Sequence, residues 1–275
     1  MPELPETETI ARDLEAAIRG ATISGVRVTK ADVLRLVSAH AMKRRCIGAI
    51  VSKCWRRAKL VVLDLNTGYR IVVQPRFTGA LLIDTALLPA AERRYTAVTW
   101  TLTDGRQLRY RDVRRLGTVA VMSPSAFAAA DLALGVEPLD QTLSPDRFSA
   151  LVRASRQSIK KVLMDQHVIA GVGNIYANEA LWLSAVDPSR AGRSLSVGES
   201  ARLLDELRTV LTAAIAARGT SFRDYRDASG ARGAFVDQLQ AYGRAGLPCL
   251  RCGHRLIGTH AIDGRATVFC ATCQR

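Results

Sequence analysis

The sequence predicts a multidomain α+β protein, and three observations carry this prediction. Short runs rich in β-branched residues alternate with Gly- and Asn-containing turns over residues 21–122, a pattern typical of an antiparallel β-sandwich. After Ser144 the apolar residues recur with helical spacing. Two Cys-x2-Cys pairs close the chain. We therefore expect an N-terminal helix with a β-sandwich, then a helical domain, then a small domain organised by its cysteines.

The first expected element is a helix over residues 6–19, because Ile10, Leu14 and Ile18 fall on one face of it. Pro5 suits the first helical turn, where a backbone N–H donor is not needed. The glutamates that follow suit the positive end of the helix dipole.

The β-rich region contains four clear strand candidates, over residues 60–65, 69–73, 97–102 and 107–110. The turn sequences Asn66-Thr67-Gly68 and Asp104-Gly105 separate them in pairs, which predicts two hairpins. Repeated hairpins of this kind predict an antiparallel sandwich or barrel.

Four helices are expected after the sandwich, over residues 144–152, 158–164, 174–183 and 199–218. Gly171 and Gly173 permit a tight turn before the third helix, and Asn174 can cap it. Such a pair of helices can present backbone N–H groups to a phosphate, although an ordinary α-hairpin explains the pattern equally well.

The C-terminal cysteines have the spacing of a zinc ribbon rather than of a disulfide framework, since the N-terminus shows no export signal. The expected ligands of one structural Zn²⁺ are Cys249, Cys252, Cys270 and Cys273. The intervening segment predicts a β-hairpin with its turn at Asp263-Gly264. Cys46 and Cys54 fit small core residues.

The formal net charge of +14 indicates a polyanionic partner, with nucleic acid favoured over an anionic membrane surface. A generally basic surface is the alternative. No apolar run reaches the length of a membrane span, and no signal peptide is evident, so we expect a cytoplasmic protein.

Four separated motifs together resemble the bacterial formamidopyrimidine-DNA glycosylase and endonuclease VIII family. They are PELPE at 2–6, RRAK at 56–59, DQHVIAGVGNIYANEAL at 165–181, and the terminal zinc ribbon. The resemblance implies a catalytic β-sandwich domain over 1–136, a helix–two-turns–helix domain with a lesion loop over 137–243, and a zinc ribbon over 244–275. It also implies a monomer, associated with the nucleoid, that acts on double-stranded DNA with oxidised bases or abasic sites.

The resemblance also assigns catalytic roles to four residues. Pro2 would be the nucleophile, because removal of Met1 leaves it with a free secondary amine. Glu3 would protonate the sugar, Lys59 would assist β-elimination, and Arg265 would bind the lesion's phosphate. Glu6 would support proton transfer, although capping of the first helical turn explains it as well.

A further set of residues would contact DNA by the same resemblance. These are Phe77, Tyr95, Arg114, Leu116, Arg156, Lys160 and Asn174. Phe77 and Leu116 replace the methionine and phenylalanine that relatives insert into the base stack, and Tyr95 replaces a histidine.

The substrate class has two candidates. PELPE and the length of segment 220–235, which could close over a base, favour oxidised purines. The altered wedge positions and Thr7, where valine is usual, favour the oxidised pyrimidines of endonuclease VIII.

A catalytically silent paralogue that binds damaged DNA is a third hypothesis, but a protein that only binds DNA would not need the N-terminal amine. A membrane-surface protein would need a basic amphipathic helix, and this sequence shows none.

Overall fold

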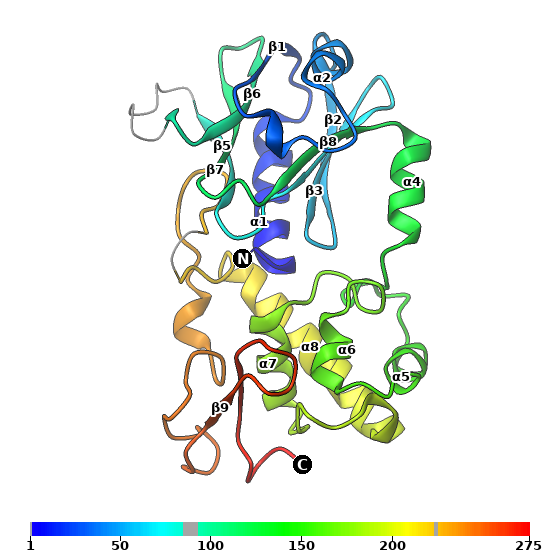
Figure 1. Ribbon diagram of the computed structural model, residues 1–275, viewed down its shortest axis with the longest axis vertical. Helices are drawn as coiled ribbons and strands as arrows, with labels where there is room; N and C mark the ends of the chain where they lie inside the picture. Colours follow the sequence, from blue (N-terminus) through cyan, green and yellow to red (C-terminus); the bar gives the residue numbers. More distant parts are fainter. Residues whose placement is uncertain (1, 85–92, 223–224) are drawn as a thin grey trace. The chain divides into compact units, whose positions relative to one another are not determined.

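The computed structural model describes residues 2–84, 93–222 and 225–275 (Figure 1). Its backbone separates into two compact units. Residues Met1–Leu132 and Ala217–Ala234 form the first, called here the sandwich unit. Residues Ala133–Ala216 and Phe235–Arg275 form the second, called the helical unit. The chain therefore leaves the sandwich unit and returns to it once.

Helix α1 (Leu4–Ile18) opens the sandwich unit and lies against its strands (Figure 1). Ile10, Leu14 and Ile18 are fully buried in the same core as residues of both sheets, as the helical periodicity predicts. Glu3 is the N-cap residue and Pro5 lies in the first turn. Burial of a Leu or Ile side chain stabilises a fold by about 1.5–3 kcal/mol, so this face fixes the helix on the sandwich.

Two four-stranded antiparallel sheets make the sandwich, which confirms the predicted fold class. One sheet has the order β1 (Ile23–Val28), β6 (Thr96–Leu102), β7 (Gln107–Asp112), β5 (Gly79–Asp84). The other has the order β2 (Val51–Arg57), β3 (Leu60–Leu65), β4 (Arg70–Gln74), β8 (Thr118–Met122). Trp100 and Tyr110 are fully buried between them.

Helix α4 (Pro124–Leu132) explains why β3 has a nearly continuous apolar sequence. Val61 and Leu63 belong to the main core, whereas Val62 packs on the opposite face with Phe127 of α4. A strand buried on both faces loses the usual alternation of apolar and polar residues. The sequence pattern did not predict α4.

Helix α2 (Ala39–Cys46) was also not predicted, because its basic residues stand out more than its short apolar face. Ser38 caps it, accepting the N–H of Ala41 at 3.1 Å. Met42 and Cys46 are fully buried. A 3₁₀ turn, η1 (Ala31–Val33), precedes this helix.

The helical unit contains four helices close to the predicted ranges. They are α5 (Pro145–Arg153), α6 (Ile159–Met164), α7 (Asn174–Leu183) and α8 (Val197–Ala216), with the 3₁₀ turns η2 (Gly192–Ser194) and η3 (Phe235–Gln238). Helices α7 and α8 pack side by side (Figure 1). Ser144 caps α5 through the N–H of Arg147 at 3.2 Å.

The predicted C-terminal hairpin consists of β9 (Ile257–Thr259) and β10 (Thr267–Phe269), paired antiparallel. Its loop runs over residues 260–266 and includes Gly264 at φ +76°, the left-handed region that favours glycine. Trp182 of α7 shares a buried cluster with Val268 and Cys270, so the hairpin is anchored to the helices.

None of the helices in the described ranges combines the length and the apolar content needed to cross a bilayer.

Candidate functional site

The N-terminal residues are held at the start of α1 by a buried glutamate. Pro2 and Glu3 are buried, and Glu6 is 1% exposed. Glu6 Oε2 accepts the N–H of Glu3 at 2.8 Å, and Glu6 Oε1 accepts the N–H of Thr220 at 2.7 Å. The carboxylate therefore fixes both the N-terminal residues and the segment that returns from the helical unit. Met1, whose removal the predicted nucleophilic role of Pro2 requires, lies outside the described residues.

Lys59 lies in the turn between β2 and β3. It is 8% exposed, and Ala58 before it has φ +52°. The left-handed conformation costs a non-glycine residue about 1–2 kcal/mol. Packing must compensate for this strain, because Ala58 is itself 2% exposed. The turn thereby sets the direction of the lysine.

Phe77, Arg114 and Leu116 lie on two turns of the sandwich unit, and the structure brings the first two together. The guanidinium carbon of Arg114 lies 5.7 Å from the centre of the Phe77 ring. Phe77 and Leu116 are 47% and 40% exposed.

Tyr95 is partly buried and lies beneath two cations. The guanidinium carbons of Arg94 and Arg111 lie 4.6 and 5.6 Å from the centre of its ring. The aromatic residue at this position is therefore surrounded by positive charge.

Residues of α6, α7 and the β9–β10 loop meet within the helical unit. Asn174 donates its side-chain N–H to the backbone oxygen of Ala266 at 2.9 Å. Lys160 Nζ donates to the same oxygen at 3.2 Å and to Thr267 Oγ1 at 2.7 Å, and it pairs with Asp263 at 3.3 Å. These contacts fix the loop that carries Arg265.

One expectation about these residues is wrong. Asn174 does not cap α7: Gly173 is the N-cap residue, and the Asn174 amide points to the loop. Lys160 is fully buried, and its ammonium group is enclosed by the loop, so its contact with DNA stays a prediction. Arg265 and Arg156 are exposed.

The segment that returns to the sandwich unit is anchored on α1 by a second set of carboxylates. Arg218 donates to Asp13 at 2.7 Å and to Asp227 at 2.5 Å. Burial opposes ionisation of Asp227, but the hydrogen bonds from Arg218, Ser229 and Ala231 outweigh it and lower its pKa. No sequence pattern predicted this anchor, because Asp13 lies 205 residues from Arg218 along the chain.

Glu179 is another structural support that sequence patterns missed. It is 1% exposed on α7 and accepts the N–H groups of Gln240, Ala241 and Tyr242 at 2.7–2.9 Å. Burial raises its pKa, although these three donors act in the opposite direction. Glu179 thereby holds the start of the C-terminal segment on the helices.

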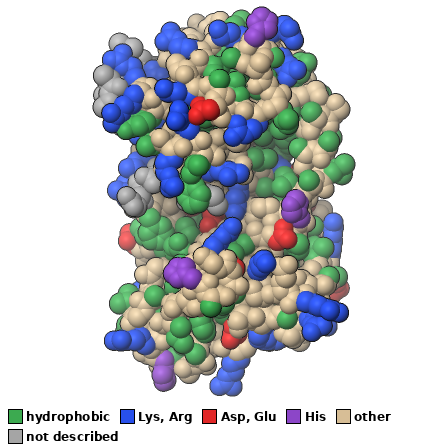
Figure 2. All heavy atoms as spheres, in the orientation of Figure 1, with side chains coloured by type: hydrophobic (Ala, Val, Ile, Leu, Met, Phe, Trp, Pro, Cys, Tyr) green, Lys and Arg blue, Asp and Glu red, His purple; other side chains and the backbone are tan. Residues whose placement is uncertain are grey.

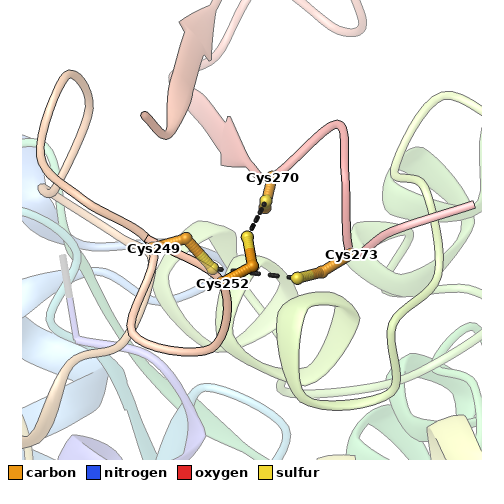
Figure 3. A group of neighbouring side chains, drawn as sticks. All are labelled: Cys249, Cys252, Cys270 and Cys273. Atoms are coloured by element: carbon orange, nitrogen blue, oxygen red, sulfur yellow. Dashed lines mark hydrogen bonds between the residues drawn. The ribbon is translucent and has the colours of Figure 1, made fainter. Parts of the chain in front are cut away.

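The four C-terminal cysteines converge from the two ends of the hairpin domain (Figure 3). Their sulfur atoms lie within 4.8 Å of one another, with Cys252 and Cys270 at 3.5 Å and Cys249 and Cys273 at 4.0 Å. A zinc tetrahedron with bonds of about 2.3 Å has edges of about 3.8 Å. The residues therefore fit one structural Zn²⁺.

The thiols are also placed for ionisation. Burial opposes it at Cys249, but the N–H groups of Arg251 and Cys252 outweigh this and lower its pKa to about 6. The contact with the Cys252 thiol instead raises the pKa of Cys273 to about 12. The reason is that negative charges on neighbouring sulfur atoms repel one another. A divalent cation removes that repulsion.

Lys and Arg side chains are spread over the face shown in Figure 2, where Asp and Glu side chains are fewer. This agrees with the formal net charge of +14 and with a polyanionic partner.

Three family models match the chain in order. They describe the formamidopyrimidine-DNA glycosylase N-terminal domain at residues 1–119, the H2TH domain of the same enzymes at 134–226, and a zinc finger found in FPG and IleRS at 246–275. A formamidopyrimidine-DNA glycosylase of Roseiflexus sp. is 39% identical over the full length of both chains. The chain belongs to the formamidopyrimidine-DNA glycosylase family.

Other comparisons agree with this membership. The formamidopyrimidine-DNA glycosylase of Thermomicrobium roseum is 40% identical, over 100% of this chain and 99% of its own. Among solved structures, Lactococcus lactis Fpg in complex with DNA containing an abasic site has a TM-score of 0.91 at 31% identity, covering 99% of both chains. MutM in complex with DNA containing carbocyclic 8-oxo-G has a TM-score of 0.90 at 31% identity, covering both chains fully.

Proposed function

We propose that this glycosylase-family chain removes oxidised purines, 8-oxoguanine and formamidopyrimidines, from double-stranded DNA and then cleaves the strand as an abasic-site lyase. The observation that carries the proposal is the Pro2-Glu3 terminus, buried and held by Glu6 at the start of α1. Full-length relatives are named formamidopyrimidine-DNA glycosylases, and solved relatives hold DNA with an abasic site or 8-oxo-G.

Pro2 is the proposed nucleophile. An α-amino group has a pKa near 8, so once Met1 is removed a useful fraction of the Pro2 amine is neutral at physiological pH. Its attack on C1′ forms an N–C1′ bond and expels the base. Glu3 protonates O4′ as the C1′–O4′ bond opens, which leaves an iminium. Loss of a 2′ proton then eliminates the 3′ phosphate, and a second elimination releases the sugar from the 5′ phosphate.

The remaining residues have supporting roles in this proposal. Lys59 transfers protons during elimination, and Arg265 binds the phosphate of the damaged nucleotide. Asn174 and Lys160 act through the loop that carries Arg265. Both side chains donate to the backbone oxygen of Ala266 in that loop. The DNA contacts are assigned to Phe77, Tyr95, Arg114, Leu116 and Arg156.

Zinc has a structural role in the proposal: it neutralises the four thiolates and joins the two ends of the hairpin domain. We further propose the domain limits 1–136, 137–243 and 244–275, and a cytoplasmic, nucleoid-associated monomer.

Borohydride trapping on a duplex with 8-oxoguanine opposite cytosine tests the function. Protein shown by intact mass to lack Met1 should form a covalent adduct, and Glu3→Gln should cut the duplex at least about 100-fold more slowly. The same lesion should be cut at least as fast as thymine glycol. Absence of an adduct contradicts the glycosylase proposal, whereas faster cutting of thymine glycol favours the endonuclease VIII specificity.

A further inference from the structure

Asp112, the last residue of β7, is a buried carboxylate to which the roles above assign nothing. It is 1% exposed. Oδ1 accepts Thr78 Oγ1–H at 2.5 Å and the N–H of Arg114 at 3.2 Å. Oδ2 accepts the N–H of Gly117 at 2.8 Å and Tyr110 Oη–H at 3.0 Å. All four groups donate, which suits a carboxylate that only accepts.

These hydrogen bonds join two turns that are separate in sequence. Residues 75–78 connect β4 to β5, and residues 113–117 connect β7 to β8, so each turn crosses from one sheet to the other. Thr78 belongs to the first turn, and Arg114 and Gly117 belong to the second. Thr78 Oγ1 also accepts the N–H of Arg114 at 3.0 Å, which makes the link direct as well as through Asp112.

Both turns are closely packed at their glycines. A Cβ atom on Gly117 would lie 2.0 Å from Tyr110 Oη, and one on Gly79 would lie 2.0 Å from the backbone oxygen of Pro75. Arg76 and Arg115 have φ of +54° and +52°. Non-glycine residues keep this conformation only where their surroundings enforce it.

The same turns expose apolar side chains at their tips. Phe77 is 47% exposed, Val113 42% and Leu116 40%. The Arg114 guanidinium stacks on the Phe77 ring. Extrusion of a nucleobase leaves a gap in the base stack, and apolar side chains can fill it. The exposed cation and apolar groups on these closely linked turns suit such an insertion.

We propose that Asp112 is a positioning residue that locks the two turns into one rigid wedge, so that Phe77, Arg114 and Leu116 enter the duplex together. This inference rests on the proposed glycosylase function. A preformed wedge loses little conformational entropy when it inserts, whereas two independent turns would have to be ordered at that moment. Asp112 therefore supports extrusion of the base and not the chemistry at the sugar.

Asp112→Asn tests the proposal. The substitution keeps the shape of the side chain but replaces one accepting oxygen by an N–H₂ group, which would then face a group that also donates. Excision from a duplex with 8-oxoguanine opposite cytosine should fall about 10- to 100-fold. Elimination at an abasic site in a single strand, where no base is extruded, should change less than about twofold. Asp104→Asn, an exposed carboxylate in the β6–β7 turn, is the matched control and should change neither rate.

A second variant, Thr78→Val, removes the direct link at nearly constant volume and should lower duplex excision in the same direction by a smaller factor. Fluorescence of 2-aminopurine beside the lesion should rise more slowly in both variants. Equal loss on duplex and single strand, or no loss on the duplex, overturns the proposal. A wild-type chain inactive on both substrates would instead refute the glycosylase function itself.

Discussion

Lys160 shows how a single buried cation can hold a loop in place. Its ammonium group is fully buried and pairs with Asp263, which is 4% exposed at its side chain. Burial of an ion pair is costly unless further hydrogen bonds satisfy both partners. Thr267 and the Ala266 oxygen accept from the lysine. Asp263 Oδ1 also accepts the N–H of Arg265, at 2.9 Å. The pair therefore stabilises the shape of the Arg265 loop.

Replacing Lys160 by Met should lower the free energy of unfolding by about 3–5 kcal/mol, because it leaves Asp263 buried without its cation. Urea denaturation measures this directly. Lys161→Met, at an exposed position one residue on, is the matched control and should cost less than about 1 kcal/mol. Equal effects of the two substitutions would contradict the role of the buried pair.

Helix α8 illustrates stabilisation at the scale of an element. Ser196 and Glu199 bind each other's backbone N–H groups at its start, at 2.7 and 3.1 Å, in a capping box. Arg190 adds a two-pronged ion pair at 2.5 and 3.1 Å. The Arg190 hydrogen bond is the largest cause that lowers the pKa of Glu199, to about 2.

A lowered pKa makes this contribution pH-dependent with a definite sign. Glu199 stabilises the fold fully above its ordinary pKa of 4.5, and the contribution is lost as the pH falls towards about 2. Glu199→Gln should therefore lower the free energy of unfolding by about 1–2 kcal/mol at pH 7, since the pair is partly solvated. The difference from wild type should shrink below pH 4.5 in urea titrations.

Asp205→Asn, at an exposed position on the same helix, is the control for that series and should change the free energy of unfolding at pH 7 by less than about 1 kcal/mol. A constant difference between Glu199→Gln and wild type down to pH 2 would contradict the assignment.

Metal binding is expected to act at the scale of the whole molecule, because one zinc ion would join the two ends of the C-terminal hairpin domain. Trp182 is 4% exposed and lies under Arg251 at 4.2 Å, within a cluster that includes Cys249 and Cys270. A segment of about thirty residues forms too small a core to fold without a cross-link such as a bound metal ion.

Cys270→Ala should reduce bound zinc from one per chain towards none and expose Trp182, which shifts tryptophan emission to longer wavelength. Metal analysis and fluorescence measure the two effects. Trp182→Phe in the same background should remove the shift, since the other tryptophans, Trp55 and Trp100, lie in the sandwich unit. Zinc loss with unchanged emission would show that the hairpin packs without its metal.

Local patterns were sufficient to predict the elements that form for local reasons. The helical face of α1, strand β3, the hairpin turns at Gly68 and Gly105, and the cysteine spacing all follow from residues close together in sequence. The sequence patterns did not predict helices α2 and α4, because their apolar faces are short. These faces can be recognised only from the core clusters in which they pack.

The sequence by itself determined the residue types of the candidate site: an N-terminal proline beside a glutamate, a basic surface and four thiols at ribbon spacing. Only the tertiary structure decided which groups support them. Asp112, Glu179, Asp227 and the Lys160–Asp263 pair bind partners far away along the chain, or in turns whose contacts no local pattern encodes. A buried carboxylate must find its donors wherever the fold brings them, so its function is set by the three-dimensional arrangement and not by its neighbours in sequence.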